Sequence, residues 1–98
     1  MSSEQRTIKR VEIRVWGQVQ RVFFRSQAAK KARELNLTGW VRNESDDSVK
    51  IIAEGEEENL KRLIDWSKKG PLLARVDRIE VKWEESRGEF EEFNIVYS

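Results

Sequence analysis

The sequence contains no cysteine and no histidine among its 98 residues. Without cysteine, the chain cannot form disulfide bonds or use a thiolate nucleophile, and it lacks the ligands of Cys/His zinc sites. Without histidine, every mechanism in which an imidazole moves a proton is excluded. Any catalysis must therefore use other groups.

Long apolar runs are also missing. No run of apolar residues is longer than three, as in Val22 to Phe24 and Ile51 to Ala53, whereas a membrane-spanning helix needs about 20. The first ten residues, MSSEQRTIKR, lack the apolar centre of a signal peptide. We therefore expect a cytoplasmic protein that does not interact with membranes.

The apolar residues that are present are sufficient for one compact core. Hydrophobic residues make up 38% of the chain and include four Trp and four Phe, a composition that argues against disorder. The length fits one domain of ordinary size. We expect a monomer with a single domain over residues 1–98, in which residues 1–7 form a flexible N-terminal tail.

Charge is nearly balanced overall but unevenly distributed. The net charge is +1, yet residues 1–33 hold nine basic and two acidic residues, while residues 44–65 hold three basic and eight acidic ones. A net charge this small does not argue for a nucleic-acid partner. The basic first third is compatible with a local anion site and also with an ordinary solvated surface.

Hydrophobic periodicity predicts five strands and two helices. Apolar residues alternate with polar ones in the strand-like segments, and they recur every three or four residues in the helix-like ones. Strands are predicted over 8–16, 38–43, 48–55, 76–83 and 90–97, and helices over 23–36 and 56–69. This order predicts an α+β fold, a ferredoxin-like βαββαβ sandwich with two helices on one face of a mainly antiparallel sheet of four or five strands.

The segment that joins the first strand to the first helix is the most informative. It reads GQVQRVFFR over residues 17–25. Backbone N–H groups of such a loop, together with the free amides of the following helix, form a concave anion site. Arg25 lies in the predicted first turn, where its guanidinium could hold two oxygens of a phosphate. The simpler alternative is that Arg25 only lies on the surface.

At these residues the chain resembles the acylphosphatase family. The first family signature, G-x-V-Q-G-V-x-[FY]-R, is matched by Gly17-Gln18-Val19-Gln20-Arg21-Val22-Phe23-Phe24-Arg25. The second, G-[WF]-V-x-N-x-x-D-G-x-V, is matched by Gly39-Trp40-Val41-Arg42-Asn43-Glu44-Ser45-Asp46-Asp47-Ser48-Val49. The resemblance extends from Val11 to Tyr97.

The resemblance implies an enzyme that hydrolyses the carboxyl-phosphate bond of small acyl phosphates to a carboxylate and inorganic phosphate, without a metal or a cofactor. It implies that Arg25 binds the phosphate and that Asn43 positions the attacking water. Inorganic phosphate or sulfate would compete with the substrate for this site. The loop residues expected to bind phosphate with Arg25 are Gln18, Val19, Gln20, Arg21, Val22 and Phe23.

The sequence departs from the family pattern at two glycines. Arg21 and Asp47 stand where the pattern has Gly. If those glycines adopt a positive φ, a replacement costs about 1 kcal/mol, and Asp in a turn tolerates it better than Arg. Arg21 either distorts the loop or adds a second cation beside the phosphate.

The alternative to an enzyme is a non-catalytic ferredoxin-like module that binds an anion, a nucleic acid or a protein. The four tryptophans, with Arg10 and Arg14 on the first strand, could suggest stacking on RNA bases, but a place in the core or at its rim is the better interpretation of Trp16, Trp40, Trp66 and Trp83. The sequence lacks the K/R-G-F-G-F-V type of strand that RNA-recognition domains use, so no nucleic-acid partner is expected. The acidic cluster of Glu54, Glu56, Glu57 and Glu58 is predicted to complement the dipole of the second helix and to aid solubility rather than to bind a cation.

Overall fold

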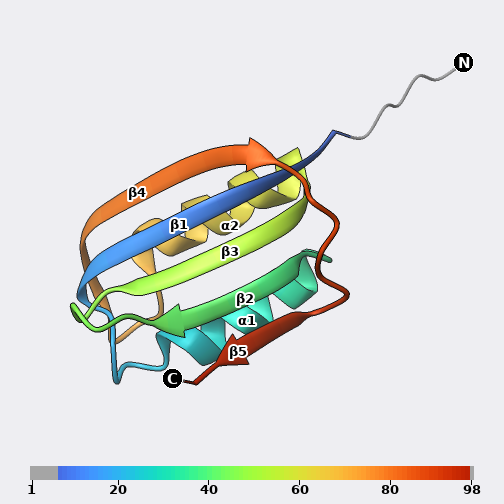
Figure 1. Ribbon diagram of the computed structural model, residues 1–98. Coiled ribbons are helices and arrows are strands. Elements are labelled where there is room, and N and C mark those ends of the chain that lie inside the picture. Colours follow the sequence, from blue (N-terminus) through green and yellow to red (C-terminus); the bar gives the residue numbers. More distant parts are fainter. Residues whose placement is uncertain (1–6, 98) are drawn as a thin grey trace, which may run out of the picture.

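The structure is a computed structural model that describes residues 7–97. The elements follow one another as β1 (Ile8–Gln18), α1 (Phe24–Glu34), β2 (Thr38–Asn43), β3 (Val49–Glu56), α2 (Glu57–Lys69), β4 (Arg75–Glu85) and β5 (Phe93–Val96) (Figure 1). The expected tail, residues 1–7, lies outside the described residues except for Thr7, whose carbonyl oxygen accepts a hydrogen bond from the Glu57 N–H.

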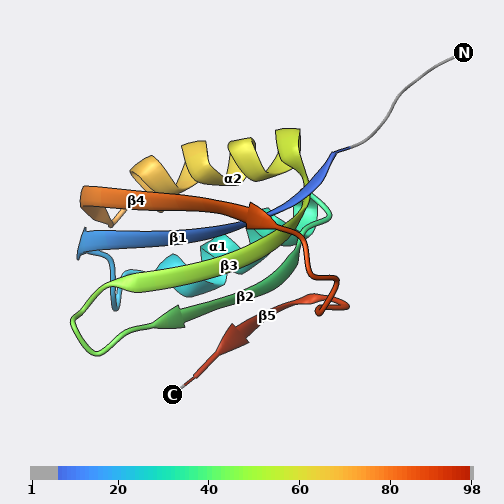
Figure 2. The same cartoon turned by 45° about the horizontal axis from the view of Figure 1, so that its top comes forward.

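The five strands form one sheet in the order β4-β1-β3-β2-β5. All neighbours are antiparallel except β2 and β5, which are parallel. Both helices cover the same face of the sheet, and the other face is open (Figures 1 and 2). The predicted α+β ferredoxin-like sandwich is confirmed, and the sheet has the larger of the two predicted strand numbers.

The core lies between the sheet and the helices. Alternate residues of β1, namely Val11, Ile13 and Val15, are fully buried against the helices, as a half-buried strand requires. The Phe24 ring of α1 meets the Trp66 ring of α2 edge to face, with centroids 5.2 Å apart. A T-shaped pair is a favoured aromatic geometry. The contact therefore stabilises the packing of the two helices against each other.

The two helices differ at their N-termini. In α2, Glu57 and Glu58 lie in the first turn and complement the positive end of the helix dipole. In α1, the first turn has no acidic residue, and its N-cap residue, Phe23, makes no side-chain capping bond. The positive end of α1 is therefore not compensated by its own sequence. Within residues 7–97, neither helix is long and apolar enough to span a membrane.

The role predicted for one acidic residue is wrong. Glu54 does not complement the dipole of α2 but lies on the open face of the sheet, 4% exposed, in an ion pair with Arg10. Its carboxylate also accepts hydrogen bonds from the Ser86 hydroxyl and from the backbone N–H groups of Arg87 and Gly88. Glu54 thus holds the β4–β5 connection onto the sheet. This connection explains why β5 begins at Phe93 rather than at the predicted Phe90.

Two glycines of the matched signatures are required by the sheet. At Gly17, where the β1–β4 register shifts, a Cβ atom would lie 2.1 Å from the Arg75 carbonyl oxygen. At Gly39 a Cβ atom would lie 1.9 Å from the carbonyl oxygen of Ile52 on β3. Both also have a positive φ, so no other residue fits there without moving the backbone. The two signatures are therefore each anchored to the sheet at their first residue.

Candidate active site

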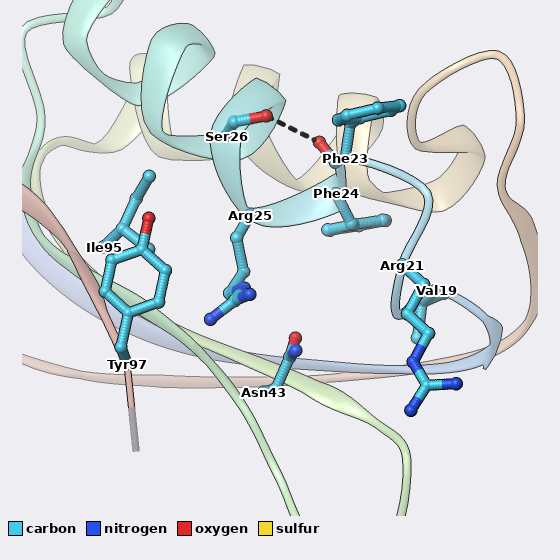
Figure 3. A pocket seen from close by; sticks show the side chains of 9 residues that line it. All are labelled: Val19, Arg21, Phe23, Phe24, Arg25, Ser26, Asn43, Ile95 and Tyr97. Atoms are coloured by element: carbon cyan, nitrogen blue, oxygen red, sulfur yellow. Dashed lines mark hydrogen bonds between the residues drawn. The ribbon is translucent and has the colours of Figure 1, made fainter.

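A pocket of about 270 Å³ lies where the β1–α1 loop (residues 19–23), the start of α1, the end of β2 and the end of β5 meet (Figure 3). It brings together residues that are far apart in the sequence. The residues that line it are Val19, Arg21, Phe23, Phe24, Arg25, Ser26, Asn43, Ile95 and Tyr97.

The β1–α1 loop has an unusual backbone. Arg21 and Phe23 both adopt the left-handed conformation, with φ of 65° and 66°. Left-handed residues that alternate with others in a short loop can turn successive N–H groups to one side and so form an anion-binding concavity. Arg21 therefore adopts the positive φ that was expected if the glycine of the family pattern at this position has one. The same holds at Asp47, where φ is 70°.

Arg25 lies in the first turn of α1, as predicted, and its side chain points into the pocket. Its guanidinium carbon lies 4.7 Å from the centre of the Tyr97 ring, a cation–π contact. Tyr97 follows β5 and is 71% exposed. Within residues 7–97, no acidic side chain forms an ion pair with Arg25, so its charge is not neutralised by a neighbouring carboxylate.

Asn43 is the last residue of β2, where it pairs with Val49 of β3. Its side chain points toward Arg25 across the pocket (Figure 3). The amide oxygen of Asn43 is buried and accepts no hydrogen bond within the described part of the chain. A buried acceptor without a donor costs free energy, so this oxygen is available for a donor that enters the pocket.

Gln20, one of the predicted phosphate-binding residues, uses its side chain to connect two segments of the site. Its side-chain amide donates two hydrogen bonds of 2.9 Å, to the carbonyl oxygens of Glu44 and Ser48. It therefore ties the β1–α1 loop to the hairpin that follows Asn43. Among the predicted loop residues, Val19, Arg21 and Phe23 line the pocket. Gln18, Gln20 and Val22 line a neighbouring hollow, which Val19, Arg21 and Asp47 line as well.

The turn between β2 and β3 is fixed by Asp46. One carboxylate oxygen of Asp46 accepts hydrogen bonds from the hydroxyl and the N–H of Ser48, and the other accepts from Trp16 and Arg14. The Ser48 hydroxyl and N–H are the main reasons that the pKa of Asp46 falls to about 2. Asp46 therefore stays ionised at neutral pH and keeps the end of β2 in place.

The sequence analysis missed the part of the pocket that β5 provides. Ile95 and Tyr97 share one face of the predicted last strand, but alternation alone did not say which strand they would lie beside. The parallel pairing with β2, in which Val41 lies opposite Ile95, carries them to the pocket. Ser26 was also missed. Its hydroxyl donates to the Phe23 carbonyl oxygen and so stabilises the start of α1.

The pocket offers hydrogen-bond donors and positive charge, and no acidic side chain of the described residues lines it. Within residues 7–97, no three His, Cys, Asp or Glu side chains gather where they could share a metal ion. The lining contains two guanidinium groups and the N-terminus of α1, and these features favour a bound anion. The arrangement can hold an anion such as a phosphoryl group beside the amide of Asn43.

Comparisons with known proteins agree with this chemistry. The family model described as Acylphosphatase matches residues 11–95. A Methylococcus capsulatus protein named acylphosphatase is 47% identical over 91% of this chain and 97% of its own length. A Thermococcus kodakarensis acylphosphatase is also 47% identical, over 89% of this chain and 94% of its own. The crystal structure of acylphosphatase from Bacillus subtilis superposes with a TM-score of 0.87 at 36% identity, over 91% of this chain and 99% of that one.

Proposed function

The chain belongs to the acylphosphatase family and hydrolyses acyl phosphates, and we propose that Arg25 binds the phosphoryl group while Asn43 positions the attacking water. The observation that carries this proposal is that one pocket receives both side chains, from α1 and from β2, pointing toward one another. The alternative of a non-catalytic module has no support in the comparisons.

Three features support a phosphoryl site at Arg25. Its planar guanidinium can donate two parallel hydrogen bonds to phosphoryl oxygens. The first turn of α1 contains no acidic residue, so a bound anion is left as the partner of the positive helix end. The left-handed residues Arg21 and Phe23 shape the loop beside it. Together these groups supply the charge stabilisation that phosphoryl transfer needs in the absence of a metal.

Asn43 supports the second half of the mechanism. An amide offers one acceptor and two donors, and the buried amide oxygen of Asn43 has no donor within the described residues. In our proposal this oxygen accepts a hydrogen bond from the attacking water and orients the water lone pair toward phosphorus. Positioning of this kind can lower a barrier by several kcal/mol without any acid or base.

The chemistry balances without a protein base. The water oxygen forms a bond to phosphorus while the bond from phosphorus to the carboxyl oxygen breaks, and the electron pair of that bond leaves with the carboxylate. A carboxylate is a good leaving group, so it needs no proton from the protein. Both protons of the water end on the inorganic phosphate. A phosphoryl oxygen can accept the transferred proton directly, which fits a site with no histidine.

Turnover of benzoyl phosphate by the purified protein tests this proposal. We expect steady hydrolysis that is insensitive to EDTA, with magnesium controlled separately because it binds the substrate, and competitive inhibition by inorganic phosphate or sulfate. Loss of activity with chelator, restored by one added metal, would contradict a site built from a guanidinium and backbone amides.

A further inference from the structure

Arg21 is a second uncompensated cation in the same pocket as Arg25. Most other arginines of the described chain face an acidic side chain. Neither Arg21 nor Arg25 forms an ion pair with an acidic side chain in residues 7–97, and no acidic residue lines the pocket. The paired arginines are Arg10, Arg14, Arg42, Arg75, Arg78 and Arg87.

The backbone at Arg21 is strained. Its φ of 65° places an L-residue in the left-handed region, at a cost of about 1 kcal/mol relative to glycine. Glycine is the residue that the first signature places at this position. The chain therefore keeps a cation at the pocket although a glycine would fit the backbone better. An interaction of the Arg21 side chain, rather than of its backbone, accounts for the arginine at this position.

The two guanidinium groups lie apart. Figure 3 shows Arg25 between Tyr97 and Asn43, whereas Arg21 extends from the loop on the far side of Asn43. A phosphoryl group held by Arg25 and beside the water of Asn43 fills only part of the pocket. If the phosphoryl group lies between Arg25 and Asn43, the lining that is left for the acyl half of the substrate includes the exposed side chains of Arg21 and Phe23.

We propose that Arg21 determines specificity for acyl phosphates whose acyl half carries a second negative group, namely a carboxylate. This inference rests on the function proposed above for Arg25 and Asn43. A guanidinium without an acidic partner attracts a carboxylate on the substrate, whereas a neutral acyl group gains nothing from it. Because Arg21 is exposed, we expect a preference of about three- to tenfold in kcat/KM.

Three substrates of matched shape test the proposal: benzoyl phosphate, 4-carboxybenzoyl phosphate and its neutral isostere 4-carbamoylbenzoyl phosphate. The para position keeps the carboxylate from attacking its own acyl group. The quantity compared is the ratio of kcat/KM for the carboxy and the carbamoyl substrate. Comparing this ratio between variants cancels the intrinsic reactivity of the two compounds.

We expect the ratio of kcat/KM to change only when the positive charge at position 21 is removed. Arg21→Gln should lower the ratio about three- to tenfold relative to the parent protein, while Arg21→Lys should retain most of it. Lys30→Gln removes the same charge from an exposed position of α1 that does not line the pocket, and it should leave the ratio unchanged. This control separates local recognition from the effect of net charge.

Three outcomes would overturn the proposal. An unchanged ratio in Arg21→Gln means that Arg21 does not recognise the acyl half. An equal loss for all three substrates means that Arg21 binds the phosphoryl group instead. An equal fall of the ratio in Lys30→Gln means long-range steering. Failure of the proposed function is distinguishable, because the parent protein would then not hydrolyse benzoyl phosphate at all.

A measurement on the parent protein keeps the test decisive if Arg21→Gln does not fold. The non-hydrolysable benzoylphosphonates with a 4-carboxy or a 4-carbamoyl group should both inhibit competitively. We expect the carboxy compound to bind about three- to tenfold more tightly at low ionic strength, and this advantage should shrink as salt screens the contact. Equal inhibition constants at low ionic strength would contradict the proposal.

Discussion

At the scale of single residues, our proposal assigns phosphate binding to Arg25 and water positioning to Asn43. Arg25→Ala should abolish turnover and weaken phosphate binding strongly, because a charge-assisted contact to the phosphoryl group is lost. Arg25→Lys should restore little, since an ammonium group cannot donate two parallel hydrogen bonds. Calorimetric titration with phosphate checks the prediction. Near-parental affinity in the alanine variant would show that the loop alone binds the anion.

Asn43→Ala should behave differently. We expect kcat to fall by about two orders of magnitude or more, since a water that is no longer oriented must find the reactive geometry by chance. Phosphate affinity should change little, because the expected partner of the Asn43 oxygen is the water. Steady-state kinetics together with phosphate titration separate the two effects. A large loss of affinity with an intact circular dichroism spectrum would assign Asn43 to the phosphoryl group instead.

Because the backbone at Arg21 is strained, we expect the glycine variant at this position to be more stable than the alanine variant, which is the reverse of the usual order. In most positions glycine is less stable than alanine, because it loses more backbone entropy on folding. At a φ of 65° the alanine variant keeps the strain while glycine relieves it. Arg21→Gly should therefore be more stable than Arg21→Ala by about 1 kcal/mol, measured by urea unfolding. The opposite order would mean that the loop relaxes out of the left-handed region.

At the scale of elements, the Gln20 side chain connects two segments that form the candidate site. Gln20 joins the β1–α1 loop to the carbonyl oxygens of Glu44 and Ser48, directly after Asn43. These hydrogen bonds connect the β1–α1 loop to the hairpin that follows β2. We therefore expect Gln20 to act as a positioning residue, although it does not line the pocket.

Gln20→Ala should lower kcat about tenfold with a smaller change in KM, because the water and the phosphoryl group lose their relative placement. It should also destabilise the protein by about 1 kcal/mol, since two side-chain hydrogen bonds are lost while the backbone N–H groups of Asp47 and Glu44 still donate to these carbonyl oxygens. Gln20→Glu should be worse, because it turns an acceptor toward two other acceptors. Gln27→Ala, on the exposed face of α1, is the matched control. Equal effects on kcat and KM would argue against positioning.

The elements also show what could be predicted from the sequence. Local periodicity was sufficient for β2, whose bounds agree with the prediction, and for α2, which begins one residue late. The sequence could single out the loop and Arg25 because their chemistry is local and contiguous. It did not reveal that Tyr97 lines the pocket or that the Gln20 side chain bonds to the hairpin, since the partners of these residues lie across the sheet or beyond a turn. Such contacts depend on strand register, which periodicity does not determine.

At the scale of the whole molecule, the open face of the sheet contributes to stability and supports the site. The Arg10–Glu54 pair is almost fully buried there, with side-chain exposures of 8% and 5%. Arg10 also contacts Glu84 and Glu89. Through the bonds of Glu54 to residues 86–88, the pair fixes the chain that leads to β5, and β5 places Ile95 and Tyr97 at the pocket.

The stability of the molecule should therefore depend on pH in the acidic range. Hydrogen bonds from the backbone of Arg87 and Gly88 and from the Arg10 side chain outweigh burial and lower the pKa of Glu54, and the pKa of Asp46 is also lowered, to about 2. A depressed folded-state pKa means that the unfolded chain binds protons first as the pH falls. The stabilisation is thus fully present above about pH 5 and is lost progressively toward pH 2.

Glu54→Gln tests this account at the level of the whole fold. Removing the charge leaves Arg10 buried without its main partner, so the variant should be less stable by about 2–3 kcal/mol at pH 7. In a domain of this size that lowers Tm by about 10–20 °C. The gap to the parent protein should narrow as the pH falls toward 2, because the parent then protonates the same carboxylate. Glu91→Gln, exposed in the same connection, should leave both Tm and its pH dependence nearly unchanged. A gap that stays constant from pH 7 to pH 2 would show that the shape of the Glu54 side chain, and not its charge, holds the β4–β5 connection in place.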